Sequence, residues 1–215
     1  MEDNRDIVIW GASGHSLVVA DILRLQGTYR VIGHLDDINV RSHGELFAGS
    51  FVLGGREQLS SLRRDGVADL CVAIGDCDAR LELADVAKEY GFNLPVVIHP
   101  SSVTAKSAQV GRGTVLCAGS IVGPLANIGE SVIVNTGVSV DHQCVIENGV
   151  HLAPGVRLAG HVKIGEGSLV GIGSVVKDQA SIGRHCLIGA GSVVVHNISD
   201  RAIAYGVPAR VRGTT

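Results

Sequence analysis

The sequence predicts an α/β domain built from parallel βαβ units, followed by a domain that coils into a parallel β-helix. Two observations carry this prediction. Up to about residue 96, short apolar stretches alternate with helical ones, and from Ile98 onward an aliphatic residue recurs at almost every sixth position. The composition agrees, because 29 glycines and only 3% aromatic residues suit many tight turns around small aliphatic side chains.

The first 96 residues alternate strand and helix signals in the order that a parallel sheet needs. Strands are expected at residues 6–12, 29–37, 68–76 and 94–100, where apolar residues are nearly continuous. Helices are expected at residues 16–27, which end at a glycine, at 56–66 and at 79–91. Strands alternating with helices form βαβ units, so residues 1–96 are predicted to be a Rossmann-like domain.

The second half repeats with a period of six residues. Four residues after each inward position stands a small or β-branched residue, such as Ser120 or Cys144. An α-helix, with about 3.6 residues per turn, cannot keep this phase for so long, whereas a three-sided β-helix uses one hexapeptide per side. Each coil then takes 18 residues, and the domain is predicted to span residues 97–198, with a tail at 199–215. Thr104 breaks the series of inward residues, which comprises Ile98, Val110, Leu116, Val122, Ile128, Val134, Val140, Ile146, Leu152, Leu158, Ile164, Val170, Val176, Ile182, Ile188 and Val194.

Charge and cysteine content disfavour several classes of function. A net charge of −3 without basic clusters gives no general attraction to nucleic acid or to anionic membranes. The N-terminal residues contain no basic segment followed by a long apolar one, and no apolar run is long enough to span a bilayer, so a cytoplasmic protein is expected. The five cysteines are scattered without a CxxC pair, which favours thiols over disulfides or zinc ligands; no metal is expected.

A histidine in the middle of the repeat is the first candidate for chemistry. His142 stands two positions after the inward Val140, so its side chain can meet solvent or ligand. An imidazole suits a general base because its ordinary pKa lies near ~6.5. Gly160 follows one coil later and would stack about 4.8 Å away. Cys144 occupies an inward slot and is expected to pack rather than to form an acyl-enzyme. The alternatives are a corner histidine and a turn glycine without chemical roles.

A glycine pair in the first half is the second candidate. Gly11 and Gly14, in WGASGHS, end a predicted strand and open a helix, where backbone amides and the helix dipole favour phosphate. The run lacks the full GxGxxG pattern, so NAD binding is disfavoured.

The hexapeptide series, the N-terminal GASGHSLVVADIL and the C-terminal YGVPARVRG together resemble the left-handed β-helix acyltransferases, in the branch of sialic-acid O-acetyltransferases and nucleotide-aminosugar N-acetyltransferases. The resemblance covers essentially the whole chain. It implies a left-handed coil, acetyl-CoA as cosubstrate and a homotrimer. It also implies that His142 is the general base, because Val140-Asp141-His142 matches the V-[DE]-H segment of the family. Many relatives follow that histidine with a carboxylate, whereas this chain has Gln143, which leaves Asp141, Glu147 or a backbone carbonyl to orient the ring.

The resemblance assigns further residues to the site. It implies that the Gly160 amide holds the thioester carbonyl and that His151 lies near the thioester, while Asn135 could support the ligand or the base by hydrogen bonding. The residues implied to hold a nucleotide-linked sugar, its diphosphate at the glycine loop, are Gly11, Ser13, Gly14, His15, Asp36, Asp37, Gly75 and Asp76. Coenzyme A would lie against Gly173, Ser174, Ala190, Gly191, Arg210 and Arg212. Helix caps, turns and solvated tail arginines are the alternative roles.

The resemblance implies an acetyl-CoA-dependent N-acetyltransferase. It would acetylate by direct transfer the amine of a nucleotide-linked 4-amino-4,6-dideoxy sugar, such as GDP-perosamine or a UDP-linked amino sugar. The alternatives are O-acetylation of sialic acid or of another sugar hydroxyl, and a non-catalytic trimeric scaffold that binds sugar nucleotides. The sequence does not separate an amine from a hydroxyl acceptor, although the nucleotide-like pocket favours the amine.

Overall fold

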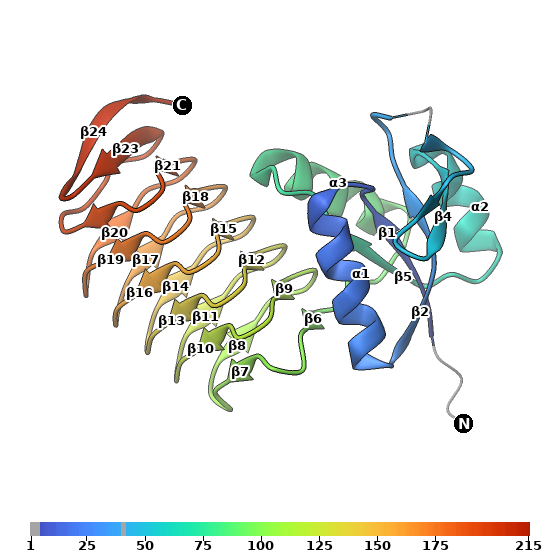
Figure 1. The fold of residues 1–215 in the computed structure, drawn as a ribbon, viewed down its shortest axis with the longest axis horizontal. Coiled ribbons are helices and arrows are strands. Elements are labelled where there is room, and N and C mark those ends of the chain that lie inside the picture. Colours follow the sequence, from blue (N-terminus) through green and yellow to red (C-terminus); the bar gives the residue numbers. More distant parts are fainter. Residues whose placement is uncertain (1–4, 40–41) are drawn as a thin grey trace. The chain divides into compact units, whose positions relative to one another are not determined.

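The computed structural model describes residues 5–39 and 42–215. The chain divides into two compact units, with the boundary between Pro100 and Ser101. Figure 1 shows the two kinds of architecture, one of helices around a sheet and one of stacked coils.

The first unit contains a five-stranded sheet in the order β3-β4-β2-β1-β5. Strand β1 is central and pairs in parallel with β2 and β5, and β2 pairs in parallel with β4, whereas β3 is antiparallel to β4. The strands are β1 (Arg5–Trp10), β2 (Tyr29–Leu35), β3 (Leu46–Phe47), β4 (Ser50–Gly54) and β5 (Asp69–Val72). The helices are α1 (Gly14–Gln26), the 3₁₀ helix η2 (Arg56–Gln58), α2 (Leu59–Arg64) and α3 (Cys77–Glu89).

Apolar side chains on the two faces of β1 explain why this sheet is covered by helices. Val8 and Trp10 are buried in a cluster with Leu59 of α2 and Leu83 of α3. Because side chains alternate along a strand, Ile7 and Ile9 point to the other face, and both are fully buried. The predicted βαβ arrangement is therefore confirmed.

Two details differ from the sequence expectation. The β3–β4 hairpin was not predicted, because its strands are short. The expected strand at 94–100 is reduced to β6 (Val97–Ile98), which is not in the five-stranded sheet. Asn93 instead forms a single bridge to Asp69 of β5. The backbone of this segment therefore follows the sheet only briefly.

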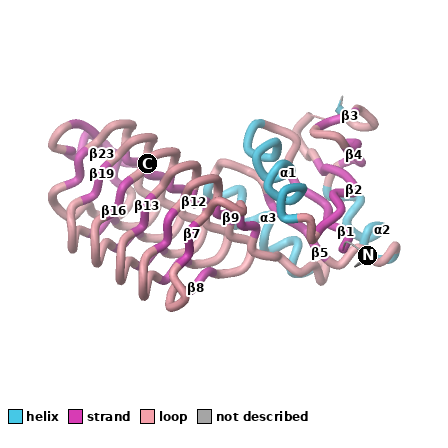
Figure 2. Tube along the Cα trace, turned by 60° about the horizontal axis from the view of Figure 1, so that its bottom comes forward, coloured by secondary structure: helices cyan, strands magenta, loops and turns pink. Residues whose placement is uncertain are grey.

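The second unit is a parallel β-helix with three faces, and Figure 2 shows its two-residue strands stacked from coil to coil. Strands one coil apart pair in parallel, as in Ile121↔Ser139↔Arg157. The first face has β7 (Val103–Thr104), β10 (Ile121–Val122), β13 (Ser139–Val140), β16 (Arg157–Leu158), β19 (Val175–Val176) and β22 (Val193–Val194). The second has β8 (Gln109–Val110), β11 (Asn127–Ile128), β14 (Val145–Ile146), β17 (Lys163–Ile164) and β20 (Ser181–Ile182). The third has β9 (Val115–Leu116), β12 (Ile133–Val134), β15 (His151–Leu152), β18 (Leu169–Val170) and β21 (Leu187–Ile188).

The six-residue period places the core as predicted. Every inward aliphatic residue from Leu116 to Val194 is buried, and so are the small residues four positions later, from Ser120 to Ser192. Only the beginning of the series differs, since Val110 is half-buried and Thr104 exposed. The fold is thus a βαβ domain followed by a left-handed β-helix. The tail at 199–215 is a hairpin of β23 (Ala202–Gly206) and β24 (Ala209–Thr214), and β23 continues the third face by pairing with β21.

Candidate functional site

His142 lies at the turn between the first and second faces of the β-helix. We call residues 123–126, 141–144, 159–162 and 177–180 the His142 corner. His142 is exposed there, and its backbone N–H donates to Asp141 Oδ1 over 2.6 Å. Gln143 follows with φ of 57°, a left-handed conformation that most residues avoid. The local turn therefore presents the imidazole at an accessible edge.

The Gln143 side chain lies against one nitrogen of the His142 ring. The distance between His142 Nδ1 and Gln143 Oε1 is 3.3 Å. The two carboxylates expected as alternatives bind other groups. Asp141 binds the backbone N–H of His142, and Glu147 Oε2 accepts from the Glu166 N–H and pairs with Arg184.

Gly160 lies directly against the His142 ring. A Cβ atom built on Gly160 would stand 2.5 Å from His142 Cε1 and 2.6 Å from Nε2, so only glycine leaves room for the imidazole there. Within residues 5–39 and 42–215 the Gly160 N–H donates to no protein acceptor. The structure thus brings together a histidine and a backbone N–H without a protein acceptor, as the 18-residue spacing predicts.

His151 and Asn135 lie elsewhere on the coil. His151 is on the third face, and Asn135 is in the turn between the third and first faces. The Asn135 side-chain amide donates to His151 Nε2 over 3.3 Å. One face of the β-helix separates this pair from the His142 corner within a single chain.

The residues expected to bind coenzyme A group with Asn135 and His151 rather than with His142. Gly173 and Gly191 are exposed in the turns between the third and first faces, next to Ser174 and Ala190. The Ser174 hydroxyl points into the coil and donates to the Gly189 carbonyl over 3.0 Å, so it is not available to a ligand. On β24, which extends the third face, Arg210 and Arg212 are exposed.

Cys144 packs inside the coil, as its position in the repeat predicts. Its thiol donates to the Ala159 carbonyl over 3.1 Å and is buried. Burial raises the pKa of the Cys144 thiol, which suppresses the thiolate form that a nucleophile requires. The geometry therefore disfavours an acyl-enzyme on this residue.

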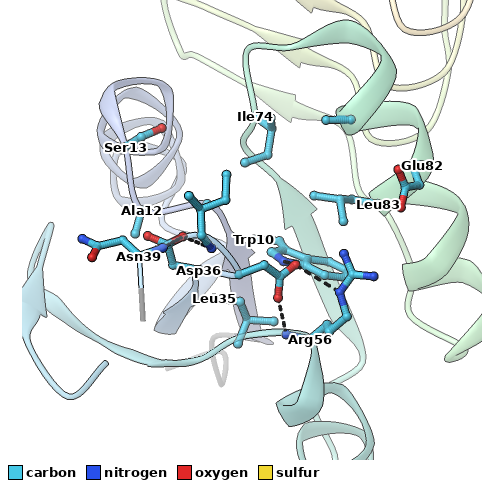
Figure 3. Close-up of a pocket in the computed structure, with 14 residues that line it drawn as sticks. Trp10, Ala12, Ser13, Leu35, Asp36, Asn39, Arg56, Ile74, Glu82 and Leu83 are labelled. Atoms are coloured by element: carbon cyan, nitrogen blue, oxygen red, sulfur yellow. Dashed lines mark hydrogen bonds and ion pairs between the residues drawn. The ribbon is translucent and has the colours of Figure 1, made fainter. Parts of the chain in front are cut away.

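The first unit contains a cavity of about 410 Å³ at the carboxyl ends of its parallel strands. In Figure 3, Ser13 and Asn39 lie on one side, Glu82 and Leu83 of α3 on the other, and Trp10 between them. Parallel sheets bind ligands at such an edge. The residues that line the cavity are Trp10, Gly11, Ala12, Ser13, Leu35, Asp36, Asp37, Ile38, Asn39, Arg56, Ile74, Ala79, Glu82 and Leu83.

A tight loop connects β1 to α1 at the rim of this cavity. Gly11 has φ of 140°, and a Cβ there would stand 2.7 Å from the Ala73 carbonyl oxygen, so the position requires glycine. The Ser16 hydroxyl accepts from the Ser13 N–H and donates to the Ser13 carbonyl, and the side chain of Ser13 is exposed. The loop and the first turn of α1 therefore form a fixed, positively polarised wall.

The two aspartates of the cavity fix the loop that follows β2. Asp36 Oδ1 accepts from the N–H groups of Ile38 and Asn39. The Asp37 carboxylate accepts from the Trp10 indole over 3.2 Å and from the Arg56 N–H over 2.6 Å. These contacts hold Trp10 and Arg56 at the cavity.

Half of the residues that the sequence predicted to bind a sugar nucleotide line this cavity. Gly11, Ser13, Asp36 and Asp37 line it, whereas Gly14, His15, Gly75 and Asp76 do not. Gly14 begins α1, and Asp76 caps α3 by accepting from the Ala79 N–H. The lining residues Trp10, Asn39, Arg56 and Glu82 were missed because nothing in their local sequence distinguishes them from core or surface positions.

Arg80 is a further residue that the sequence did not single out. Its side chain is buried, and Nη1 donates to the carbonyl oxygens of Ile74, Gly75 and Asp76 over 2.8, 3.0 and 3.1 Å. Burial lowers the pKa of this guanidinium. Arg80 thereby braces the turn that leads to the Ile74 wall of the cavity.

Residues 5–39 and 42–215 contain no group of three or more His, Cys, Asp or Glu side chains that could hold a metal ion. No helix in the same residues is long and apolar enough to cross a bilayer.

One family model matches residues in the first unit, and two others match residues in the β-helix. Residues 6–87 match the PglD N-terminal domain, residues 126–154 match the hexapeptide repeat of succinyl-transferase, and residues 161–196 match the bacterial transferase hexapeptide model of six repeats. A curated relative, UDP-N-acetylbacillosamine N-acetyltransferase from Bacillus subtilis (strain 168), is 34% identical over 116 residues. This match covers 53% of the chain and about half, 52%, of that relative.

Solved structures match over nearly the whole length. A histidine-to-alanine mutant of GDP-perosamine N-acetyltransferase from Caulobacter crescentus, in complex with CoA and GDP-perosamine, is 38% identical with a TM-score of 0.93 over 97% of each chain. The acetyltransferase domain of PglB from Neisseria gonorrhoeae FA1090, in complex with acetyl coenzyme A, is 37% identical with a TM-score of 0.91, covering 97% of this chain and 100% of that one.

Proposed function

The chain belongs to the hexapeptide-repeat nucleotide-aminosugar N-acetyltransferases. We propose that it uses acetyl-CoA to acetylate the amine of a nucleotide-linked 4-amino-4,6-dideoxy sugar. GDP-perosamine and UDP-linked amino sugars are the candidate substrates. The observation that carries the proposal is the match over 97% of both chains to a structure that holds CoA and GDP-perosamine.

The His142 corner supports direct transfer. The amine nitrogen attacks the thioester carbonyl carbon, the carbon–sulfur bond breaks, and the proton lost by the amine passes to His142 Nε2 and then to the leaving thiolate of CoA. The developing negative charge on the carbonyl oxygen needs a fixed donor, and the Gly160 N–H, which has no protein acceptor, lies beside the ring. Asp141 supports the turn that presents His142.

The cavity of the first unit supports the binding of the nucleotide part. The β1–α1 loop around Gly11 and Ser13 offers backbone amides at a helix N-terminus, which suits the diphosphate. Trp10 and Arg56 add an aromatic ring and a cation to the same cavity. We assign residues 1–96 to nucleotide-sugar binding, residues 97–198 to acyl transfer and the tail at 199–215 to CoA binding through Arg210 and Arg212.

A homotrimer is part of the proposal. His142 and Gly160 lie at one corner of the coil, whereas Asn135, His151 and the other CoA-binding candidates lie along another. One complete site would therefore combine the His142 corner of one copy with the third face of the next. We also propose a cytoplasmic location, because acetyl-CoA and sugar nucleotides are cytoplasmic metabolites.

A substrate panel tests the function. Purified protein is incubated with acetyl-CoA and with GDP-, UDP- and dTDP-linked 4-amino sugars, and released CoA thiol is measured. The expected result is thiol release with at least one nucleotide-linked amino sugar and none with sialic acid or with the corresponding 4-hydroxy sugar nucleotide. Release only with a hydroxyl acceptor would establish the O-acetyltransferase alternative. Calorimetric absence of acetyl-CoA binding would instead indicate a scaffold.

A further inference from the structure

The His142 corner keeps side chains where the backbone favours glycine. Leu125, Gln143, His161 and Gln179 occupy the same turn position in successive coils, with φ between 57° and 61°. At the turns between the third and first faces, the left-handed position is glycine in every coil, as at Gly155 and Gly173. Left-handed φ is unfavourable for residues with a Cβ, and such strain is often retained where a side chain has a function.

Two of these four side chains touch His142. Gln143 Oε1 lies 3.3 Å from His142 Nδ1. A side-chain carbonyl oxygen only accepts, so Oε1 at this place favours the tautomer with its proton on Nδ1, in which Nε2 keeps the lone pair that a general base needs.

His161 contacts the same ring from the next coil. The two imidazole rings meet at right angles with their centroids 5.2 Å apart. The His161 N–H also donates to the His142 carbonyl over 3.0 Å, which ties the two turns together. With Gly160 beneath Cε1 and Nε2, the His142 ring is confined on three sides.

We propose that Gln143 and His161 are positioning residues for His142: Gln143 fixes the Nδ1–H tautomer, and His161 holds the ring over Gly160. The proposal rests on the proposed function of His142. Neither partner is a carboxylate: Gln143 offers an amide dipole at Nδ1, and His161 offers an aromatic ring edge.

Kinetics of matched variants test the proposal. Gln143→Gly removes the hydrogen-bond acceptor without straining the turn, and His161→Gly removes the ring that contacts His142. Each variant is expected to lower kcat about tenfold, with little change in KM. This is the usual effect of losing one hydrogen bond or one ring contact. Gln143→Glu and His161→Phe keep an acceptor and a ring respectively, and are expected to recover kcat to within about threefold of wild type.

Gln179→Gly is the control. Gln179 has φ of 61° at the same turn position, but its side-chain amide bonds to Asp178. This variant relieves the same strain as Gln143→Gly and is expected to leave kcat unchanged. A stability effect of the turn alone would change thermal unfolding of both variants equally, whereas positioning changes kcat in only one.

Nitrogen NMR shifts of histidine-labelled protein add a readout that needs no substrate. The wild type is expected to show His142 as the Nδ1–H tautomer, and Gln143→Gly as a mixture of tautomers. Equal tautomer populations in both proteins, or normal kcat in both Gln143→Gly and His161→Gly, would overturn the proposal. Absence of acetyl transfer by the wild type on every amino sugar would refute the proposed function instead, while the tautomer measurement would still decide whether Gln143 orients the ring.

Discussion

At the scale of single residues, the absence of a side chain at Gly160 is as important as the imidazole of His142. An added methyl group would meet only the imidazole at close range, and not the backbone. We predict that Gly160→Ala folds normally, because the ring can move away, and that kcat falls about 100-fold, because a base displaced by about 1 Å transfers protons poorly. Steady-state kinetics with circular dichroism on the same samples check this, and a kcat near that of wild type would contradict it.

The sequence predicted single residues where spacing alone decides their place. The 18-residue coil was sufficient to pair His142 with Gly160. It could not predict the contact of Gln143, because that contact depends on the left-handed φ of the turn, which periodicity does not encode. Likewise, Trp10 and Arg56 meet through Asp37 only after three strands are assembled.

At the scale of elements, stacked coils bury thiols that titrate only under alkaline conditions. Cys117 is fully buried, and burial raises its pKa from 9.0 to about 12. The folded state therefore keeps the proton after the unfolded chain has lost it. The contribution of Cys117 to the free energy of unfolding is complete below pH 9.0 and declines as the pH rises toward about 12, by up to about 1.4 kcal/mol per pH unit.

We predict that Cys117→Ala flattens this alkaline loss of stability. Denaturant unfolding of wild type and variant at neutral pH and at about pH 11 measures it, since the difference between the two proteins removes the contribution of other titrating groups. Parallel decreases in the free energy of unfolding for both proteins would show that Cys117 is not responsible.

Strands that belong to a long sequence repeat could be predicted, whereas short strands outside the repeat could not. Sixteen stacked two-residue strands, β7 to β22, follow from one six-residue rule. The β3–β4 hairpin contains only seven strand residues by the bounds Leu46–Phe47 and Ser50–Gly54, too few to show alternation above the noise of a single sequence.

At the scale of the whole molecule, the proposed trimer makes a specific prediction about mixtures. If His142 of one copy works with His151 of the next, His142→Ala and His151→Ala homotrimers are both impaired. Unfolding and refolding them together in equal amounts should restore about a quarter of the wild-type activity, since about one interface in four then has both histidines. No recovery, although mass spectrometry shows mixed trimers, would place both histidines in the same subunit's site or outside it.

In the proposed reaction, His142 is the general base of an N-acetyl transfer. The most direct test is kcat/KM of His142→Ala on the best nucleotide-linked amino sugar at saturating acetyl-CoA, with calorimetry confirming that both substrates still bind. Loss of a general base predicts a decrease of about 100- to 10,000-fold with binding retained. A kcat/KM near that of wild type would contradict the assignment.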